Sequence, residues 1–341
     1  MSARRILVTG ATGIVGTEVM RLLERQPGVS VRGVSRSGDP ARGVLPWHMG
    51  ADPAPAEVRE TAWDVIVHAA ADIRWNLDFD TALATNVAAT RAVLALIGAH
   101  TNVVHVSTAF ATGLRGDIAS EDRADYRNSY EWSKAFAERE LDRVCPNWTV
   151  RPPMIIGSGR DGGRIARFHG VYQVVQGYLW GALPVMVANS RCPVELVGVD
   201  AVADLIVDRA LSPRPSAKQA STMGAGAAAL PGDLVVKLVF DELNAWRMER
   251  GVPRVELPPL IEPRRWERFF RPFAEQHLSP RQLDLIHSFD PYLPYWGMDD
   301  HVHPDVLVGD VETTLRSSIR FWADRHPRSA SSVPRPWKAA R

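Results

Sequence analysis

The chain has 341 residues, of which 45% are hydrophobic and 23% are charged, and its formal net charge is +1. This composition is typical of a globular protein with a substantial core, and it excludes a disordered or fibrous chain. The near-zero net charge excludes a general electrostatic attraction to nucleic acid or to an anionic membrane, and two cysteines are too few for a disulfide framework.

No apolar run approaches the length of a membrane-spanning helix, and a glycine follows the first apolar run at once. We therefore expect a cytoplasmic protein with no membrane insertion and no nucleic-acid partner. Cys145 and Cys192 are expected to be buried apolar residues in a reducing compartment. The histidines show no ligand-like spacing, so no metal site is expected.

Short apolar runs alternate with longer amphipathic segments in the N-terminal half. Strands alternating with helices of these lengths indicate βαβ units, and they predict an α/β fold with a doubly wound parallel sheet. The strands are expected at residues 5–9, 29–35, 45–49, 64–68, 102–107 and 148–151, and the helices at 15–25, 57–61, 79–99 and 130–144.

The pattern changes after Pro153. We expect a cofactor-binding domain over residues 1–157, completed by a strand and a helix at about 194–211. A smaller C-terminal substrate-binding lobe is expected from residues 158–193 and 212–327, with helices at 232–251 and 310–325. The tail 328–341 is rich in Ser, Pro and Arg and is expected to be disordered.

A glycine-rich turn joins the first predicted strand to the first helix, with the spacing Gly-x-x-Gly-x-x-Gly. The first glycine permits the tight exit from the strand, the second lets the backbone approach a pyrophosphate, and the third lets helix and strand pack closely. Because the turn opens an amphipathic helix, it predicts a Rossmann dinucleotide site rather than a plain strand-to-helix turn. Its residues are Thr9, Gly10, Ala11, Thr12, Gly13, Ile14, Val15 and Gly16.

The end of the second strand indicates which nicotinamide cofactor is used. An acidic residue at this position holds the ribose 2′-hydroxyl of NAD, but this chain has Ser35 and Arg36 there. Arg36 could form a charge-assisted contact with a 2′-phosphate, so NADPH is preferred over NADH; the alternative is a solvated loop arginine. Asp52 could accept a hydrogen bond from the adenine amine, or it is a simple loop residue.

Tyr130 and Lys134 lie four positions apart and share one face of a predicted helix. A nearby ammonium group favours the phenolate, so we expect Lys134 to lower the pKa of Tyr130 and allow proton exchange with a carbonyl or hydroxyl oxygen. Lys134 is also the only lysine before residue 218. The alternative is an exposed Tyr–Lys pair with no catalytic role.

Two other strand ends carry candidate site residues. Thr108, or in second place Ser107, could hydrogen-bond a substrate oxygen, although either hydroxyl could serve only a turn. After His68, the small residues Ala69, Ala70 and Ala71 would let the backbone lie against the ribose and nicotinamide. The polar Asn86, in an Ala-rich helix, indicates a structural or proton-relay hydrogen bond. His68 itself is interpreted as a packing residue.

Together these motifs resemble the extended short-chain dehydrogenase/reductase superfamily over about residues 4–157. The resemblance rests on the glycine turn, residues 68–71, Asn86, Ser107-Thr108, the Tyr130/Lys134 pair and Arg151-Pro152. It implies that Tyr130 is the acid/base, that Lys134 positions the ribose and that Thr108 orients the substrate oxygen. It also places Ser107 and Pro152 beside the cofactor.

Within the superfamily, residues 68–75, Asn86-Val87 and residues 106–110 resemble the thioester-reductase and fatty-acyl-reductase branch. That branch uses NADPH to reduce acyl thioesters of coenzyme A or a carrier protein. The resemblance therefore implies a small-molecule or thioester-bound substrate and an acyl carrier protein in trans; a homodimer is also compatible with the family. Ala89 departs from the glycine that the family commonly carries there.

The same residues are compatible with other functions. A ketone or alcohol dehydrogenase and a nucleotide-sugar 4-epimerase use the same residues. A 4,6-dehydratase is disfavoured because Ala109-Phe110 follow Thr108 instead of an Asp-Glu pair. A non-catalytic dinucleotide sensor is disfavoured because both Tyr130 and Lys134 are present. The aromatic residues of the C-terminal half either line an apolar substrate pocket or belong to its core.

Overall fold

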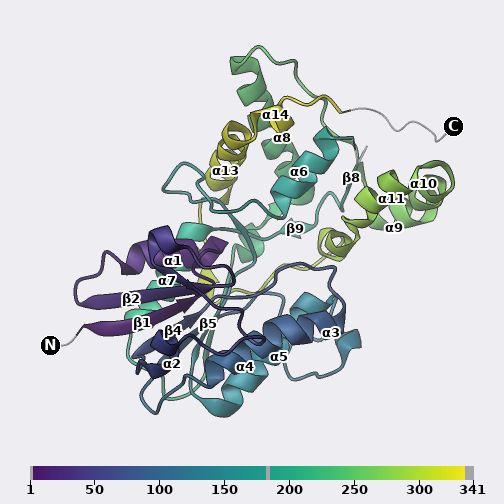
Figure 1. The fold of residues 1–341 in the computed structure, drawn as a ribbon. Coiled ribbons are helices and arrows are strands. Elements are labelled where there is room, and N and C mark those ends of the chain that lie inside the picture. Colours follow the sequence, from purple (N-terminus) through teal and green to yellow (C-terminus); the bar gives the residue numbers. More distant parts are fainter. Residues whose placement is uncertain (1–2, 182–184, 335–341) are drawn as a thin grey trace. The chain divides into compact units, whose positions relative to one another are not determined.

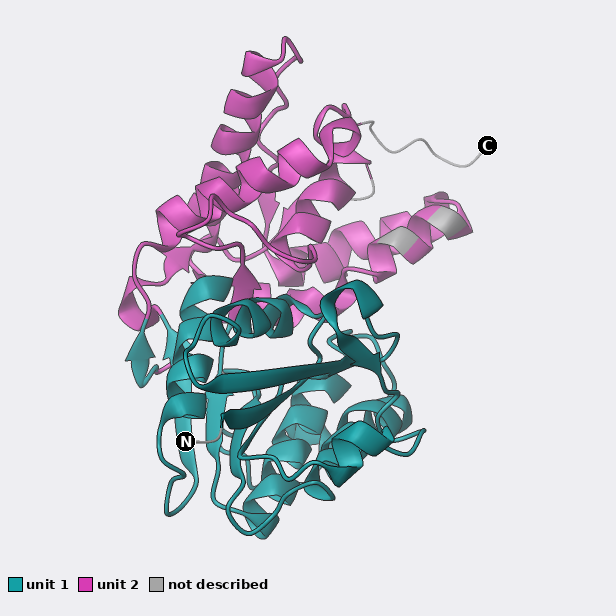
Figure 2. Cartoon of the chain, turned by 60° about the vertical axis from the view of Figure 1, so that its left-hand side comes forward, with its two compact units in different colours: residues 1–153, 199–224, 304–307 teal, residues 154–198, 225–303, 308–341 magenta. Residues whose placement is uncertain are grey.

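The computed structural model describes residues 3–181 and 185–334 (Figure 1). The chain forms two compact units, each made of several segments (Figure 2). Unit 1 comprises residues 1–153, 199–224 and 304–307, and unit 2 comprises residues 154–198, 225–303 and 308–341.

Unit 1 is built on an eight-stranded sheet with the strand order β14-β11-β6-β5-β4-β1-β2-β3, in which every neighbouring pair is parallel. The fold class is therefore the expected α/β doubly wound sheet. The strands are β1 (Arg4–Thr9), β2 (Val29–Ser35), β3 (Val44–Pro46), β4 (Val65–His68), β5 (Asn102–Val106), β6 (Trp148–Arg151), β11 (Gln219–Gly224) and β14 (Val306–Leu307).

Helices cover both faces of this sheet: α1 packs against α7, whereas α5 packs against η2 and α4 (Figure 1). A parallel sheet covered on both faces requires strands that are apolar on both sides, and β4 and β5 are buried at every position. The helices of unit 1 are α1 (Ile14–Leu23), η1 (Pro40–Arg42), α2 (Ala56–Glu60), α3 (Phe79–Ala82), η2 (Leu83–Val87), α4 (Ala88–Leu94), η3 (Arg123–Asp125), α5 (Ser129–Val144) and α7 (Val199–Leu211).

The strand register aligns the carboxyl ends of the central strands. Thr9 at the end of β1 lies opposite Val34 of β2 and His68 of β4. His68 in turn lies opposite His105 of β5. The residues that follow these strands therefore meet at one edge of the sheet, where open α/β sheets bind their ligands.

Two expected elements differ from the structure. The apolar run at 194–199 does not join the large sheet: β10 (Leu196–Gly198) pairs with β7 (Met154–Ile156) in unit 2. The large sheet is instead extended by β11, which pairs with β6. The prediction was wrong because apolar periodicity indicates a strand but does not identify the strand that pairs with it. The helix expected over 79–99 is present as α3, η2 and α4, and it ends at Leu94.

Unit 2 combines short two-stranded sheets with helices, of which α8 packs against α13. Its strands also include β8 (Met186–Val187), β9 (Pro193–Val194), β12 (Leu230–Pro231) and β13 (Leu260–Ile261). Its helices are α6 (Val171–Leu179), η4 (Gly226–Ala228), α8 (Gly232–Glu249), α9 (Pro263–Arg265), η5 (Trp266–Phe270), α10 (Arg271–His277), α11 (Pro280–His287), η6 (Asp290–Tyr292), α12 (Leu293–Trp296), α13 (Val311–Arg325) and α14 (Pro327–Ala330).

The expected disordered tail begins with ordered structure. Arg247 of α8 is fully buried, and its guanidinium donates hydrogen bonds to the carbonyls of Ala330 and Ser332. A buried guanidinium requires such partners, so it holds residues 327–332 against α8. The composition of this segment did not reveal this long-range contact. Residues 335–341 of the expected tail lie outside the described residues.

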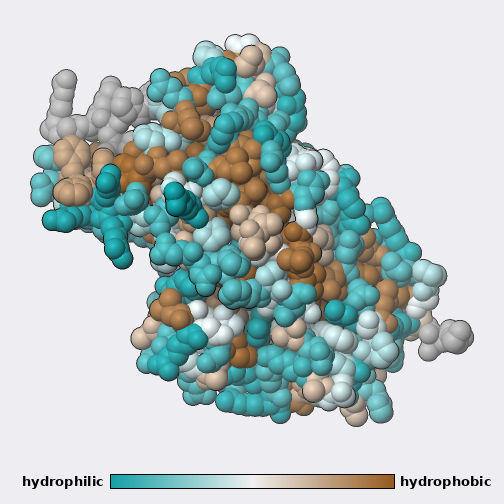
Figure 3. Space-filling view, turned by 180° about the vertical axis from the view of Figure 1, so that it is seen from behind, coloured by the Kyte–Doolittle hydropathy of each residue, from teal (hydrophilic) through white to brown (hydrophobic). Residues whose placement is uncertain are grey.

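The exposed face in Figure 3 carries apolar patches among polar side chains. Large exposed apolar residues of unit 2 include Trp180, Phe269 and Phe273. None of the helices within residues 3–181 and 185–334 has both the length and the apolar character needed to cross a bilayer.

Candidate active site

The glycine turn is shaped for close approach of a ligand. Gly10 has φ +69°, and a Cβ atom added there would lie 2.8 Å from the backbone nitrogen of Ala70. A Cβ atom on Gly16 would lie 2.1 Å from the carbonyl oxygen of Gly10, so the turn tolerates no side chain at either position. The following helix α1, which begins at Ile14, has no side-chain cap at its N-cap residue Gly13. Its first N–H groups therefore point to a site for an anion.

Thr9 links the glycine turn to the neighbouring strand β4. Its hydroxyl lies 2.8 Å from Nδ1 of His68 and accepts a hydrogen bond from the backbone nitrogen of Ala70 at 3.3 Å. Nε2 of His68 lies 3.1 Å from the hydroxyl of Thr90. Burial lowers the pKa of His68 to about 3, so its ring stays neutral and serves as a packing and hydrogen-bonding residue.

Asn86 ties the loop after β4 to helix α5. Its amide nitrogen donates to the carbonyl of Asp72 at 3.0 Å and to the hydroxyl of Ser133 at 2.9 Å. Its amide oxygen accepts from the backbone nitrogen of Asp72 at 2.6 Å. These three bonds use both ends of the buried amide and give Asn86 a structural role. The two bonds to Asp72 fix the loop segment that also contains Ala69, Ala70 and Ala71.

Tyr130 lies in the first turn of α5, where the side chain of the N-cap residue Asn128 accepts a hydrogen bond from the backbone nitrogen of Glu131 at 3.0 Å. The Thr108 hydroxyl acts directly on the Tyr130 phenol. Burial raises the pKa of Tyr130 above its usual range, the charge of Glu131 raises it further, and the Thr108 hydroxyl lowers it. The phenol is therefore in its protonated form at neutral pH.

Lys134 is buried on the same helix, one turn after Tyr130. Burial lowers the pKa of Lys134 to about 8, and the carboxylate of Glu138 opposes this shift. We expected the ammonium group to lower the pKa of Tyr130, but in the structure burial prevails and the shift is upward. The sequence indicated the pairing of the two residues, whereas the degree of burial depends on tertiary packing.

Sequence reasoning missed the carboxylate of Glu138, which is fully buried. It accepts hydrogen bonds from the guanidinium of Arg151 at 2.6 and 2.9 Å and from the ammonium group of Lys218 at 3.0 Å. These two cations lower the pKa of Glu138 although burial raises it. The available signal was its position four residues after Lys134 on the same helix face.

The remaining expected site residues occupy different environments. Ser107 and Thr108 are buried directly after β5, and the backbone nitrogen of Ala109 donates to the carbonyl of Pro152 at 2.9 Å. Arg36 is exposed after β2. The pKa of Asp72 is lowered mainly by a hydrogen bond from Arg74, and the charge of Arg36 lowers it further.

Asp52 is exposed, and its carbonyl accepts a hydrogen bond from the indole nitrogen of Trp47 at 3.1 Å. The structure shows no contact that gives the Asp52 carboxylate a role. Thr12, Ile14 and Val15 lie in the glycine turn or the first turn of α1, as the spacing predicts.

Residues 48–206 match the family model described as male sterility protein. Over 196 residues the chain is 34% identical to the polyketide synthase–nonribosomal peptide synthetase ACE1 of Pyricularia oryzae. That match covers 46% of this chain and 5% of the relative, so this chain corresponds to a small part of that protein.

Solved structures share the fold at low sequence identity. The terminal R domain from the myxalamid PKS-NRPS biosynthetic pathway has a TM-score of 0.69 at 18% identity, over 97% of this chain and 93% of that one. A thiolation-reductase di-domain from an archaeal nonribosomal peptide synthetase has a TM-score of 0.66 at 13% identity, over 96% and 77%. UDP-glucose 4-epimerase from Bifidobacterium longum has a TM-score of 0.62 at 15% identity, over 95% and 99%.

Proposed function

We propose that this chain is an NAD(P)-dependent enzyme of the extended short-chain dehydrogenase/reductase superfamily and that it reduces acyl thioesters with NADPH. The observation that carries the proposal is the placement of the Tyr130 phenol next to the buried Thr108 hydroxyl and one helical turn before the buried Lys134. A hydroxyl pair of this kind can orient a substrate oxygen and protonate it, which is the proton chemistry that carbonyl reduction requires.

The residues of unit 1 fit a dinucleotide cofactor. The turn at Gly10 leaves no room for a side chain, and the uncapped N-terminus of α1 offers free N–H groups for the pyrophosphate. Loop residues 69–71 and Pro152 would border the ribose and nicotinamide. When bound, the cofactor supplies the hydride.

The chain's own residues then control the substrate oxygen. Thr108 donates a hydrogen bond that orients the carbonyl group, and Tyr130 transfers its proton to the oxygen as negative charge develops there. The Tyr130 phenol holds its proton at neutral pH, as a general acid must before the reaction. The ammonium group of Lys134 stabilises the phenolate that remains and holds the ribose.

The thioester substrate is supported by the relatives rather than by the geometry alone. The matched polyketide synthase–nonribosomal peptide synthetase and the thiolation-reductase di-domain support this choice of substrate. We propose that this chain receives its acyl group from coenzyme A or from an acyl carrier protein in trans. A nucleotide-sugar 4-epimerase is the second candidate, since the epimerase fold covers almost the same length of this chain.

The test is the oxidation of NADPH by purified protein with acyl-coenzyme A thioesters, aldehydes, ketones and UDP-sugars. We expect turnover with thioesters. Tyr130→Phe should lower kcat at least about a hundredfold, the lower range for a general acid, while NADPH affinity stays within a factor of about two. Tyr126→Phe is the matched control, because this buried phenol bonds to the carbonyl of Ser120 and to Arg139.

Full activity of Tyr130→Phe would remove Tyr130 from the reaction. Epimerisation of a UDP-sugar without thioester turnover would favour the second candidate.

A further inference from the structure

The loop after β4 carries an ion pair at the edge of the sheet where ligands bind. The carboxylate of Asp72 accepts hydrogen bonds from Nε of Arg74 at 3.0 Å, from Nη2 of Arg74 at 2.7 Å and from the backbone nitrogen of Arg74 at 3.1 Å. The Asp72 side chain is 9% exposed, whereas the Arg74 side chain is 62% exposed. The carboxylate is therefore held within the protein, and the guanidinium faces solvent.

The position of this carboxylate is fixed by η2. The backbone nitrogen of Asp72 donates to the amide oxygen of Asn86 at 2.6 Å, and the carbonyl of Asp72 accepts from the amide nitrogen of Asn86 at 3.0 Å. Asn86 is itself buried. Because the two-pronged contact with Asp72 fixes the plane of the guanidinium, Arg74 needs little further ordering to bind an anion.

The contact with Asp72 uses only part of the Arg74 guanidinium. A guanidinium has five N–H donors, and the Asp72 carboxylate engages the donor on Nε and one of the donors on Nη2. Within residues 3–181 and 185–334, no other acceptor is bonded to the Arg74 side chain. The remaining donors are therefore available to the oxygens of an anion.

Arg36 approaches the same carboxylate from the end of β2. In the sheet, β1 lies between β2 and β4, so Arg36 and the loop of Asp72 flank the glycine turn on its two sides. The charge of Arg36 extends to Asp72 and contributes to the lowered pKa of that carboxyl group. Asp72 offers one negative charge against the positive charges of Arg36 and Arg74, so this cluster has a positive excess.

A polar side chain next to Arg36 also indicates a ligand. The hydroxyl of Ser35, at the end of β2, is buried and has no hydrogen-bond partner among the residues that the structure describes. Buried hydroxyl groups are nearly always hydrogen-bonded, so this hydroxyl points to a polar group of a ligand at the end of β2.

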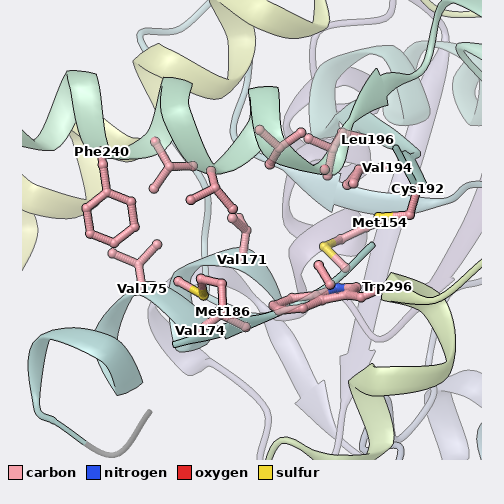
Figure 4. Close-up of a pocket in the computed structure, with 15 residues that line it drawn as sticks. Met154, Val171, Val174, Val175, Met186, Cys192, Val194, Leu196, Phe240 and Trp296 are labelled. Carbon is pink, nitrogen blue, oxygen red and sulfur yellow. The ribbon is translucent and has the colours of Figure 1, made fainter. Parts of the chain in front are cut away.

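Two features of unit 2 show by contrast what suits Arg74 to an anion. The apolar pocket in Figure 4 is lined by 15 residues, none of which has a charged side chain. Arg271 lies between the carboxylates of Glu267 and Asp290, which together outweigh its charge. Arg74 differs from both features because it is positive, exposed and paired with a single carboxylate.

We infer that Arg74 and Arg36 together bind the 2′-phosphate of NADPH. The Ser35 hydroxyl supplies a further donor, and Asp72 positions Arg74. The inference rests on the NADPH cofactor of the proposed function and adds to it a residue from a second loop. The pyrophosphate already has the N–H groups of α1, so the phosphate left for the two arginines is the one that distinguishes NADPH from NADH.

The experiment titrates the full chain with adenosine 2′,5′-bisphosphate and with 5′-AMP by isothermal calorimetry. The two compounds differ only in the 2′-phosphate, and the wild type should bind the bisphosphate more tightly. Arg74→Ala should weaken binding of the bisphosphate about tenfold or more, as expected when a charged hydrogen bond is lost, and should change 5′-AMP binding by no more than a factor of about two. Arg74→Lys should recover part of the loss, because it keeps the charge but not the two-pronged contact with Asp72.

Arg143→Ala is the matched control. The Arg143 side chain is also 62% exposed, and it pairs with the carboxylate of Glu140 at 3.1 Å. It lies in the last turn of α5, shortly before β6 begins at Trp148, and therefore near the amino edge of the sheet. Arg143→Ala should keep the wild-type affinities for both compounds. Equal losses in Arg74→Ala and Arg143→Ala would indicate a general effect of charge and would overturn the inference.

The same titrations separate this inference from the proposed function. Equal weakening of both compounds by Arg74→Ala would place Arg74 on the 5′-phosphate and overturn the inference. A preference for the bisphosphate that Arg36→Ala abolishes and Arg74→Ala leaves intact would also overturn it, while NADPH would stand as the cofactor. A wild type without any preference would contradict both. Since the titration needs no substrate, a preference lost in Arg74→Ala without any thioester turnover would support this site and contradict thioester reduction.

Discussion

At Tyr130, burial and a neighbouring hydroxyl have opposite effects on the pKa of the phenol. Burial and the charge of Glu131 raise the pKa, and the Thr108 hydroxyl lowers it. The spacing of Tyr130 and Lys134 correctly predicted that both would share helix α5. It did not predict the upward shift, because desolvation depends on residues that are distant in sequence.

Arg36 is the residue on which the proposed preference for NADPH rests. Arg36→Ala should weaken NADPH binding about tenfold or more relative to NADH, because hydrogen bonds to charged groups contribute about 1.5–3 kcal/mol. The measurement is the ratio of the two dissociation constants by fluorescence titration. Arg42→Ala, which changes another exposed arginine nearby, is the control. An unchanged NADPH/NADH ratio in Arg36→Ala would remove Arg36 from the site.

In the proposed mechanism, Glu138 is a positioning residue that acts through Lys134. Its carboxylate is buried among Arg151, Lys218 and Lys134, and it raises the pKa of Lys134 against the effect of burial. In that mechanism, the protonated ammonium group of Lys134 is the form that would stabilise the phenolate. Activity should therefore decline as the pH rises through the pKa of Lys134, about 8.

Glu138→Gln removes the carboxylate charge, so the pKa of Lys134 should fall further. The alkaline decline in kcat should then begin at a lower pH than in the wild type, as measured by a pH profile. Asp142→Asn is the matched control: Asp142 also lies on α5 and pairs with Lys218, but it is not a cause of the Lys134 shift. If kcat of Glu138→Gln declined at the same alkaline pH as kcat of the wild type, this role would be contradicted. A loss of stability alone would lower kcat at every pH without moving the pH at which the decline begins.

At the scale of elements, the π-helical segment η2 interrupts the long helix that the sequence predicted as continuous. Such segments occur frequently at functional sites, where they redirect a side chain. Here η2 contains Asn86, whose amide joins the loop at Asp72 to Ser133 of α5. Apolar periodicity predicts the helix, but it does not reveal a single widened turn.

Asn86→Ala would leave the backbone groups of Asp72 and the hydroxyl of Ser133 without this partner. Each buried unsatisfied group costs about 1–3 kcal/mol, so we expect a lower melting temperature and weaker NADPH binding. Differential scanning calorimetry and cofactor titration measure the two effects. Thr85→Ala is the control, because its hydroxyl bonds only within its own helix, to Thr81 and Ala82. Equal NADPH affinities in the two variants would show that the hydrogen bonds of Asn86 do not position the loop after β4 for cofactor binding.

At the scale of the whole molecule, unit 1 is assembled from three separated segments of the chain. Strand β11 pairs with β6, and helix α7 packs against α1. The buried side chains of α7 include Val202, Ile206 and Val207. A domain that ends at residue 157 would therefore lack part of its sheet and part of its core.

A fragment of residues 1–157 should retain helical signal in far-ultraviolet circular dichroism but lose the cooperative thermal transition. The physical reason is the apolar surface of α1 and β6 that α7 and β11 cover in the full chain. The full chain, measured in parallel, should unfold cooperatively. A sharp transition of the fragment at the temperature of the full chain would show that residues 199–224 are not needed for folding.

The sequence by itself determined the parallel α/β architecture, the glycine turn and the Tyr130/Lys134 pairing. These features depend on local periodicity and on spacings of a few residues, which survive in any tertiary arrangement. Only the tertiary structure decided which strands extend the sheet and how Glu138 is buried with Arg151 and Lys218. Those features arise where segments that are distant in sequence pack together. Burial at these places then sets the pKa values of the side chains, which the local sequence does not determine.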